Sequence, residues 1–240
     1  MRLLALFLLP LFLFAKVPFF ATFDPPEGWV IGDPSKYGKG IQVGFIQSNR
    51  KVFTPSITLA FEPIGNTDQN TYVSAAKSLF IKRGARVQEL GSFESKSGKG
   101  VLLQIDEKKG WGEVRTLQAI TLHEHTAIIH SAAILKEDFL KFHETLLKSF
   151  QSLALYPNLA ASCPDKKLQE KIDGMLKCWK KYRSTANGDA CASFSGDFFQ
   201  NNQWKPFVNY VEKELNSQGS CWQILAINHM KETLIRGEEK

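Results

Sequence analysis

The sequence predicts an α+β fold, in which an antiparallel sheet flanked by helices is followed by a small disulfide-stapled helical region. Segments of alternating apolar and polar residues, typical of strands, dominate residues 41–134. Two amphipathic helical stretches accompany them without alternating strand by strand, which favours an antiparallel sheet with segregated helices. All four cysteines fall in the last third of the 240 residues, which sets the C-terminal region apart.

The first strands and the first helix follow an opening loop at 24–40 that is rich in proline and glycine. Alternating apolar residues then predict two short strands, at 41–45 and 57–61, each with its apolar residues on one face. Helical spacing then replaces alternation over 68–83, after a cap signal at Asp68, and Gly84 closes the helix. The sequence therefore predicts two strands and a helix before the main sheet.

Four more strands and a second helix complete the predicted sheet domain. Short polar turns separate the strands, which predicts successive hairpins at 86–94, 99–108, 112–122 and 126–134. A second amphipathic helix over 136–152 carries its apolar residues at helical spacing. Its apolar stripe is expected to cover one face of the sheet.

This order of elements resembles the Mog1/PsbP-like superfamily, which includes DcrB-like exported bacterial proteins. The positions that carry the resemblance are Gly28-Trp29 in the opening loop, Pro55-Ser56-Ile57 at a strand start, Gln118 in the four-strand meander and Ser149-Phe150 at the end of a helix. The resemblance covers residues 24–153 and implies an α/β/α sandwich. The superfamily holds binding, assembly and accessory proteins without a shared catalytic motif, so the resemblance implies no active-site residues.

The first residues are typical of an export signal. Arg2 precedes an apolar run that Lys16 ends, too short for the roughly 20 residues of a transmembrane helix. Residues 1–21 are therefore interpreted as a signal peptide, cleaved after Ala15 or Ala21, with an uncleaved signal anchor left open as the alternative. The mature chain is expected to be periplasmic or extracellular.

The C-terminal region is predicted to be helical, over 165–240, behind a linker at 154–164. Helical stripes of apolar residues begin near Asp165, Trp204 and Trp222. In an exported chain the cysteines are expected to form two structural disulfides, each stabilising by about 2–4 kcal/mol. Their spacing contains no CxxC pair and leaves the connectivity open; they are Cys163, Cys178, Cys191 and Cys221.

The most promising polar cluster is His123-Glu124-His125. On an extended strand the two imidazoles point to the same side and could chelate a metal. A solvated hairpin tip is the favoured interpretation, because a catalytic zinc normally needs three protein ligands and His143 is not obviously placed to supply the third. His229 lies on an apolar helical face and is expected in the core. We therefore predict no catalytic residues, no metal ligands and no cofactor.

Charge and composition exclude one class of partner and leave others open. The formal net charge of +6 comes from basic residues interspersed with acids, whereas nucleic-acid binders concentrate Lys and Arg on one face. Weak attraction to an anionic membrane surface stays open. The sequence thus predicts a non-enzymatic accessory or binding protein of the bacterial cell envelope that acts through protein–protein contacts. The alternatives are a metal-binding protein or metal-dependent enzyme using His123 and His125, and a small-molecule carrier with a pocket between sheet and helix.

Overall fold

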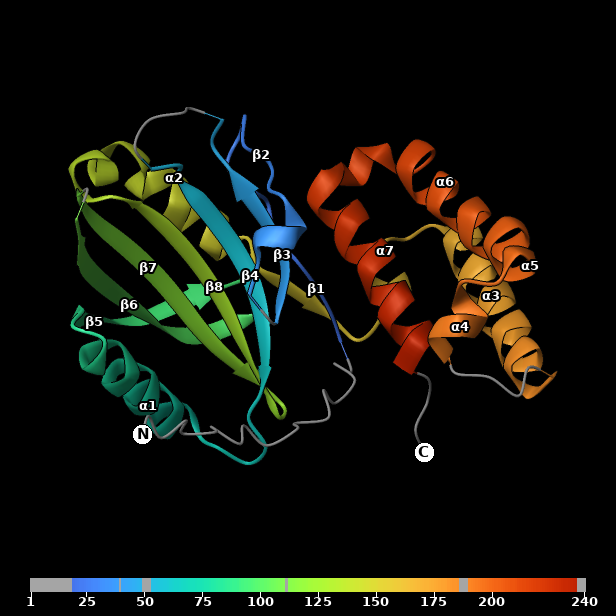
Figure 1. Cartoon of the computed structure of the whole chain (residues 1–240), viewed down its shortest axis with the longest axis horizontal. Coiled ribbons are helices and arrows are strands. Elements are labelled where there is room, and N and C mark those ends of the chain that lie inside the picture. The colour runs from blue at the N-terminus through green and yellow to red at the C-terminus, as the bar shows by residue number, and fades with distance from the viewer. Residues whose placement is uncertain (1–18, 39, 49–52, 111, 186–189, 237–240) are drawn as a thin grey trace, which may run out of the picture.

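The chain folds into a sheet part and a helical part that lie side by side (Figure 1). The computed structural model describes residues 19–38, 40–48, 53–110, 112–185 and 190–236. A seven-stranded sheet with a helix on each face forms the first part, and helices alone form the second. Within the described residues, no helix combines the length and apolar character needed to cross a membrane.

The sheet is antiparallel throughout, as the sequence predicts. Its strand order is β2-β3-β4-β8-β7-β6-β5, and the last four strands form a meander of hairpins. The strands are β2 (Val30–Ile31), β3 (Ile41–Ile46), β4 (Ser56–Pro63), β5 (Arg86–Ser95), β6 (Gly98–Lys109), β7 (Gly112–His123) and β8 (Thr126–Leu135). Helix α1 (Gln69–Lys82) precedes β5, and α2 (Phe139–Gln151) follows β8.

Alternation along the central strands gives the sheet two apolar faces. On β6, Leu103 and Ile105 pack in one cluster with Val73 of α1. Leu117 of β7 belongs instead to a second cluster, which contains Phe150 of α2. The two helices therefore cover opposite faces, which is the α/β/α sandwich that the resemblance implies. As the sequence predicts, the Asp68 side chain caps α1 by accepting a hydrogen bond from the Thr71 N–H.

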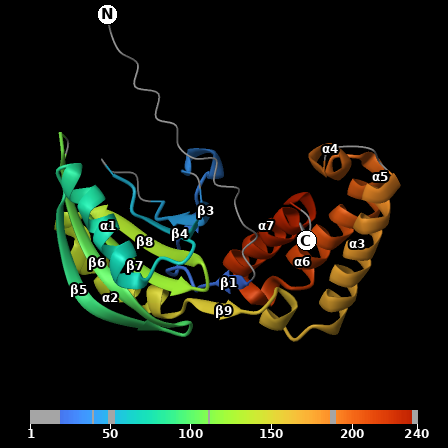
Figure 2. The same ribbon diagram turned by 90° about the horizontal axis from the view of Figure 1, so that it is seen from below.

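A separate two-stranded sheet joins the two parts, and Figure 2 shows it between them. Its strands are β1 (Phe20–Thr22) and β9 (Ala154–Tyr156), which pair antiparallel with Phe20 opposite Tyr156. Phe19, Phe20 and Ala21 are only 1–3% exposed. Cleavage after Ala21 would thus remove a core strand, whereas cleavage after Ala15 would leave it in place. Strand β9 also shows that the expected linker at 154–164 begins as sheet.

The helical part consists of two long helices with shorter helices between them, and aromatic side chains fill its centre. Trp179, Phe199, Trp204 and Phe207 are buried in its centre. Its elements are α3 (Lys166–Thr185), α4 (Ala190–Phe194), α5 (Asp197–Phe199), a π-helical turn (Gln200–Trp204), α6 (Lys205–Lys213) and α7 (Gly219–Arg236). Helices occupy most of the described residues between 166 and 236, whereas residues 186–189 and 237–240 of the predicted helical region at 165–240 lie outside the described residues.

One hydrophobic cluster runs through both parts of the chain. It includes Phe45 and Phe150 of the sheet part, Phe20 of β1, and Trp222 and Leu225 of α7. Leu159 and Cys163, in the segment between the parts, are also buried within it. The segment at 154–164 therefore marks a change of architecture along the chain and does not interrupt the core.

The predicted disulfides are not formed among the cysteines that the structure describes. Cys163, Cys178 and Cys221 are free thiols, and the side chain of Cys191 lies outside the described residues. Burial raises the pKa of Cys221 to about 12 and also raises that of Cys163. Since the thiolate is the reactive form, these two thiols are poorly suited to disulfide exchange. Aromatic packing, shared with the sheet part, holds the helical region together in their place.

Candidate functional site

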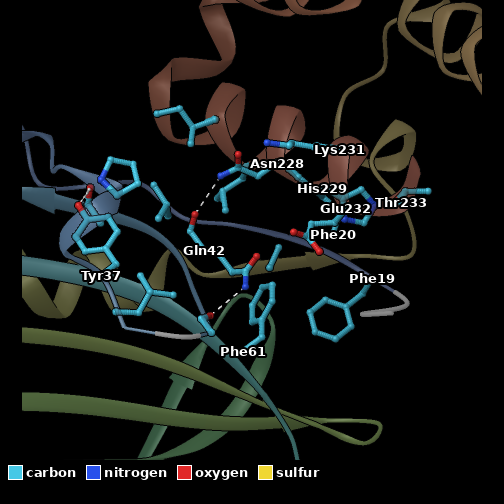
Figure 3. Close-up of a pocket in the computed structure, with 18 of the residues that line it drawn as sticks. Phe19, Phe20, Tyr37, Gln42, Phe61, Asn228, His229, Lys231, Glu232 and Thr233 are labelled. Atoms are coloured by element: carbon cyan, nitrogen blue, oxygen red, sulfur yellow. Dashed lines mark hydrogen bonds between the residues drawn. The ribbon is translucent and has the colours of Figure 1, made fainter. Parts of the chain in front are cut away.

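A cleft of about 620 Å³ lies between the start of β3 and α7, where the two parts of the chain meet (Figure 3). Ligand-binding pockets in proteins typically enclose about 300–1,000 Å³. Its apolar lining comes from β1, β3, β4 and α7 and includes Phe19, Ile41, Val43, Phe61, Ile224 and Leu225. Its polar lining includes Tyr37, Gln42, Asn228, His229 and Thr233. Both parts of the molecule are thus needed to build it.

Two adjacent phenylalanines of the N-terminal segment close one end of the cleft. Phe19 points toward the sheet, where its ring lies 5.5 Å from that of Phe61 in an edge-to-face contact. Phe20 points toward α7, and its ring lies 5.6 Å from that of His229. Because neighbouring residues of a strand point to opposite sides, this single segment contacts both walls of the cleft.

Side-chain amides connect the two walls. The Nδ2 of Asn228 on α7 donates a hydrogen bond of 3.2 Å to the main-chain carbonyl of Gln42, as the dashed line in Figure 3 shows. The Nε2 of Gln42 donates in turn to the carbonyl of Gly40, at 3.0 Å. The first bond satisfies the Gln42 carbonyl and holds α7 against β3, whereas the second lies within one wall, at a carbonyl that also accepts from the Phe61 N–H of β4.

Tyr37 forms the other end of the cleft. It follows a helical turn at Pro34–Lys36, which Asp33 caps by accepting a hydrogen bond from the Ser35 N–H. The Tyr37 hydroxyl donates to the Gly44 carbonyl at 3.0 Å, and a Cβ at Gly44 would lie 2.6 Å from that hydroxyl oxygen. A Cβ at Gly32 would lie even closer to the same oxygen, so glycine at both positions is what admits the ring. Burial raises the pKa of Tyr37 above its ordinary value.

The two histidines proposed as metal ligands do not form a chelating pair. His123 ends β7, and its ring packs edge-on against Phe19 at 5.0 Å. His125 lies in the following turn, with Nδ1 3.0 Å from the Gly65 carbonyl oxygen. Glu124 between them has φ of 50°, so the extended geometry that would align the imidazoles is broken. The described residues contain no group of three His, Cys, Asp or Glu side chains placed to hold a metal.

His130 and His143 are placed apart from the cleft. His130 is completely buried on β8, with its ring 4.3 Å from that of Phe23 and 4.6 Å from that of Phe150. Neither ring nitrogen has a hydrogen-bond partner, and burial lowers its pKa to about 3. His143 packs against Phe139 on α2. Both imidazole rings thus pack against phenylalanine side chains, and the two histidines do not form a polar site together.

Sequence patterns identified few of the residues that line the cleft. His229, expected in the core, is half-buried and lines the cleft instead. The tryptophans of the helical part, Trp179, Trp204 and Trp222, are buried in the core. The signal that could have drawn attention to the cleft is the Phe19-Phe20 pair, which was taken as part of an export signal.

Comparisons with known proteins concern the fold. No protein-family model and no curated protein sequence matches the chain. Among solved structures, the chain is similar to LpqN of Mycobacterium tuberculosis, described as involved in cell envelope biogenesis, with 14% identity, a TM-score of 0.45, and coverage of 58% of this chain and 86% of LpqN. It is also similar to cyanobacterial PsbP of Synechocystis, with 10% identity, a TM-score of 0.42, and coverage of 57% and 93%. The Saccharomyces cerevisiae Ran-binding protein Mog1p has 12% identity, a TM-score of 0.41, and coverage of 56% and 89%.

Proposed function

We propose that the chain is a non-enzymatic accessory or binding protein that works outside the cytoplasm and binds its ligand in the cleft between β3 and α7. The observation that supports this function is the cleft, because an apolar cavity of about 620 Å³ with a few convergent polar groups is typical of ligand sites. The hydroxyl of Tyr37 and the imidazole of His229 would orient the ligand, and the phenylalanine rings would cover its apolar surface.

The helical region has a defined place in this proposal, since α7 forms one wall of the cleft. A deletion of residues 160–240 would be the direct test of whether binding needs this region. In the folded chain, however, Phe20 packs against Trp222 at 6.1 Å, so the deletion would expose the core of the sheet part as well. Point variants inside the cleft separate binding from folding more cleanly.

The uncharged dye N-phenyl-1-naphthylamine, which fluoresces in apolar surroundings, tests the cleft directly. We expect the dye to bind the full chain and Ile224→Trp to reduce its fluorescence, because an indole at that half-buried position of α7 would fill the cavity. The matched control is Leu140→Trp, at a side chain that is 85% exposed on α2. Equal dye binding by both variants would argue against the cleft, as would no dye binding by the unaltered chain.

Export is tested separately from binding. The proposal that the protein works in the envelope is supported by the apolar run behind Arg2. A fusion of residues 1–30 to alkaline phosphatase, which is active only in an oxidising compartment, should give active enzyme in bacterial cells. An inactive fusion that is nevertheless expressed would contradict export and would leave the cleft as a cytoplasmic binding site.

A further inference from the structure

One wall of the cleft is the start of β3, which extends past the end of its neighbour β2. Strand β2 pairs with β3 only at Phe45 and Ile46, and the Gly32 N–H then donates to the Gly44 carbonyl at 2.9 Å. Beyond that point, residues 41–43 of β3 line the cleft. Strand β4 pairs with Ile41 and Val43 on one side, whereas on the other side, which faces α7, no described strand pairs with this stretch. A strand edge of this kind presents main-chain groups that an incoming strand can pair with.

A side chain occupies the place of the absent strand. The carbonyl of Gln42 accepts its hydrogen bond from the amide Nδ2 of Asn228, at 3.2 Å. An amide N–H is also the group that the main chain of a neighbouring strand would offer to that carbonyl. The bond is at the long end of the usual range and involves one neutral pair, so a better-placed donor can replace it.

The backbone at this edge is also open to a second chain. Gly38 and Gly40 precede the strand, and both line the cleft. Gly40 has a local explanation, because its φ is +86° and a Cβ there would lie 2.8 Å from the Phe61 carbonyl oxygen. Gly38 has no such constraint, since nothing lies within 4 Å of the position of its missing Cβ. Glycine is typical of sites where another backbone or a ligand approaches closely.

From this geometry we propose that the cleft binds an extended polypeptide segment, which adds to the open edge of β3 and replaces Asn228 at the Gln42 carbonyl. This inference rests on the proposed function and names the class of ligand. In such strand addition, main-chain hydrogen bonds supply affinity, while pockets for alternate side chains supply specificity. Here Ile41 and Phe61 line the sheet side of the cleft and Ile224 the helix side.

The probe is an acetylated and amidated pentapeptide of alternating threonine and valine, titrated against the full chain and followed by the amide resonances of the protein. Binding should shift the backbone signals of residues 41–44 and the side-chain amide of Asn228. The same peptide with N-methylated valines keeps the side chains but lacks alternate N–H donors, so it should bind about tenfold more weakly. Equal binding of the two peptides, or shifts confined to residues outside the cleft, would overturn strand addition.

Replacing Asn228 gives an opposite prediction for a peptide and for a small molecule. Asn228→Leu removes the competing donor, so the pentapeptide should bind about two- to tenfold more tightly. A ligand that uses the Asn228 amide would bind more weakly. Asn202→Leu is the matched control, because Asn202 Nδ2 also donates to a carbonyl, that of Phe198, but outside the cleft. Weaker peptide binding by Asn228→Leu, with Asn202→Leu unchanged, would overturn the inference.

The dye separates failure of this inference from failure of the proposed function. If N-phenyl-1-naphthylamine binds in the cleft and the pentapeptide does not bind at millimolar concentration, the cleft is a binding site for small apolar molecules and strand addition is wrong. If neither probe binds, both the inference and the proposed function are wrong. Displacement of the dye by the peptide, together with the N-methyl effect, would support both.

Discussion

The imidazole of His130 lies 4.3 Å from the ring of Phe23, which holds a histidine without hydrogen bonds under the N-terminal segment of the chain. The contact is reinforced next to it, where the Ser149 hydroxyl donates to the Asp24 carbonyl and the Asp24 N–H donates to the Ser152 hydroxyl. Phe23 and Asp24, which follow β1, are thus held against α2 next to His130, a buried histidine that is neutral in the folded chain.

This burial predicts a specific acid sensitivity. The pKa of His130 is about 3 in the folded chain and about 6.5 when unfolded, so only the unfolded state binds the proton between these values. The free energy of unfolding therefore carries no penalty from His130 above pH 6.5. It decreases by about 1.4 kcal/mol per pH unit as the pH falls from 6.5 toward 3. Urea unfolding of the unaltered chain and of His130→Leu between these pH values should show a shallower pH dependence for the variant.

A second histidine variant controls for the loss of any imidazole. His143→Leu removes a half-exposed ring from α2 and should leave the pH dependence close to that of the unaltered chain. If His130→Leu and His143→Leu showed the same slope as the unaltered chain, the buried ring would not be the source of acid sensitivity.

Two truncations of the N-terminus that differ by only three residues should differ strongly in stability. Deleting residues 1–18 keeps Phe19 and β1, whereas deleting 1–21 removes Phe19 and Phe20, which are 3% and 1% exposed. Loss of a buried phenylalanine side chain typically costs about 3–5 kcal/mol, a large part of the total stability of most proteins. We therefore expect thermal unfolding, followed by circular dichroism, to show a cooperative transition for the first truncation and a much lower or absent one for the second.

The variant Phe20→Ala tests the same contact without changing chain length. It should destabilise the chain in the range expected for one buried phenylalanine, and it should also weaken dye binding, because Phe20 lines the cleft. Equal stability of the two truncations would show that β1 is dispensable and would restore Ala21 as an acceptable cleavage position.

The sheet part could be predicted from local signals because its elements carry them in consecutive residues. The Asp68 cap marks the start of α1, and the hairpin between β5 and β6 has Gly98 with φ of +113° at its turn. The N-terminus shows the limit of such local signals, since Phe19 and Phe20 continue an apolar run. A buried strand and the end of an export signal have the same composition there, and only the contacts with Phe61 and His229 distinguish them.

The cleft could not be predicted in this way, because its two walls are far apart in the sequence. The hydrogen bond from Asn228 to Gln42 joins residues separated by 186 positions, and no local pattern contains that pairing. Periodicity placed His229 on an apolar helical face correctly, but it could not tell which part of the chain that face would meet. A pocket between sheet and helix was one alternative drawn from the sequence, but the sequence did not indicate which strand and which helix would form it.

The ion pair between Arg115 of β7 and Asp106 of β6 should contribute measurably to the stability of the sheet part. Arg115 donates from Nε and Nη2 to the two carboxylate oxygens of Asp106, at 2.7 Å each, and its guanidinium lies 4.9 Å from the Phe139 ring centre. These hydrogen bonds hold the pKa of Asp106 below its ordinary value. Arg115→Lys cannot reproduce the bidentate pair, so we expect a loss of about 1–2 kcal/mol in the free energy of unfolding at neutral pH.

The sign of the pH dependence follows from the depressed pKa of Asp106. Its contribution is present above the ordinary carboxyl pKa of about 3.9 and is lost as the pH falls through the lower folded-state value. The difference between the unaltered chain and Arg115→Lys should therefore shrink in strong acid. A double-mutant cycle with Asp106→Asn measures the coupling, and a coupling near zero would contradict a stabilising role for the pair.

The cysteines provide the last prediction, since their environments differ. Cys178 is partly exposed on α3, whereas Cys163 and Cys221 are 3% exposed. Reaction with a thiol requires the thiolate, and burial raises the pKa of Cys221 to about 12. In the native chain, a disulfide reagent such as dithionitrobenzoate should therefore modify Cys178 rapidly and Cys221 only after unfolding. Mass spectrometry of the protein purified from an oxidising compartment, digested without reduction, tests the same point: peptides joined through Cys163 or Cys221 would show that the thiols do pair, and that the disulfides expected from the sequence form after export.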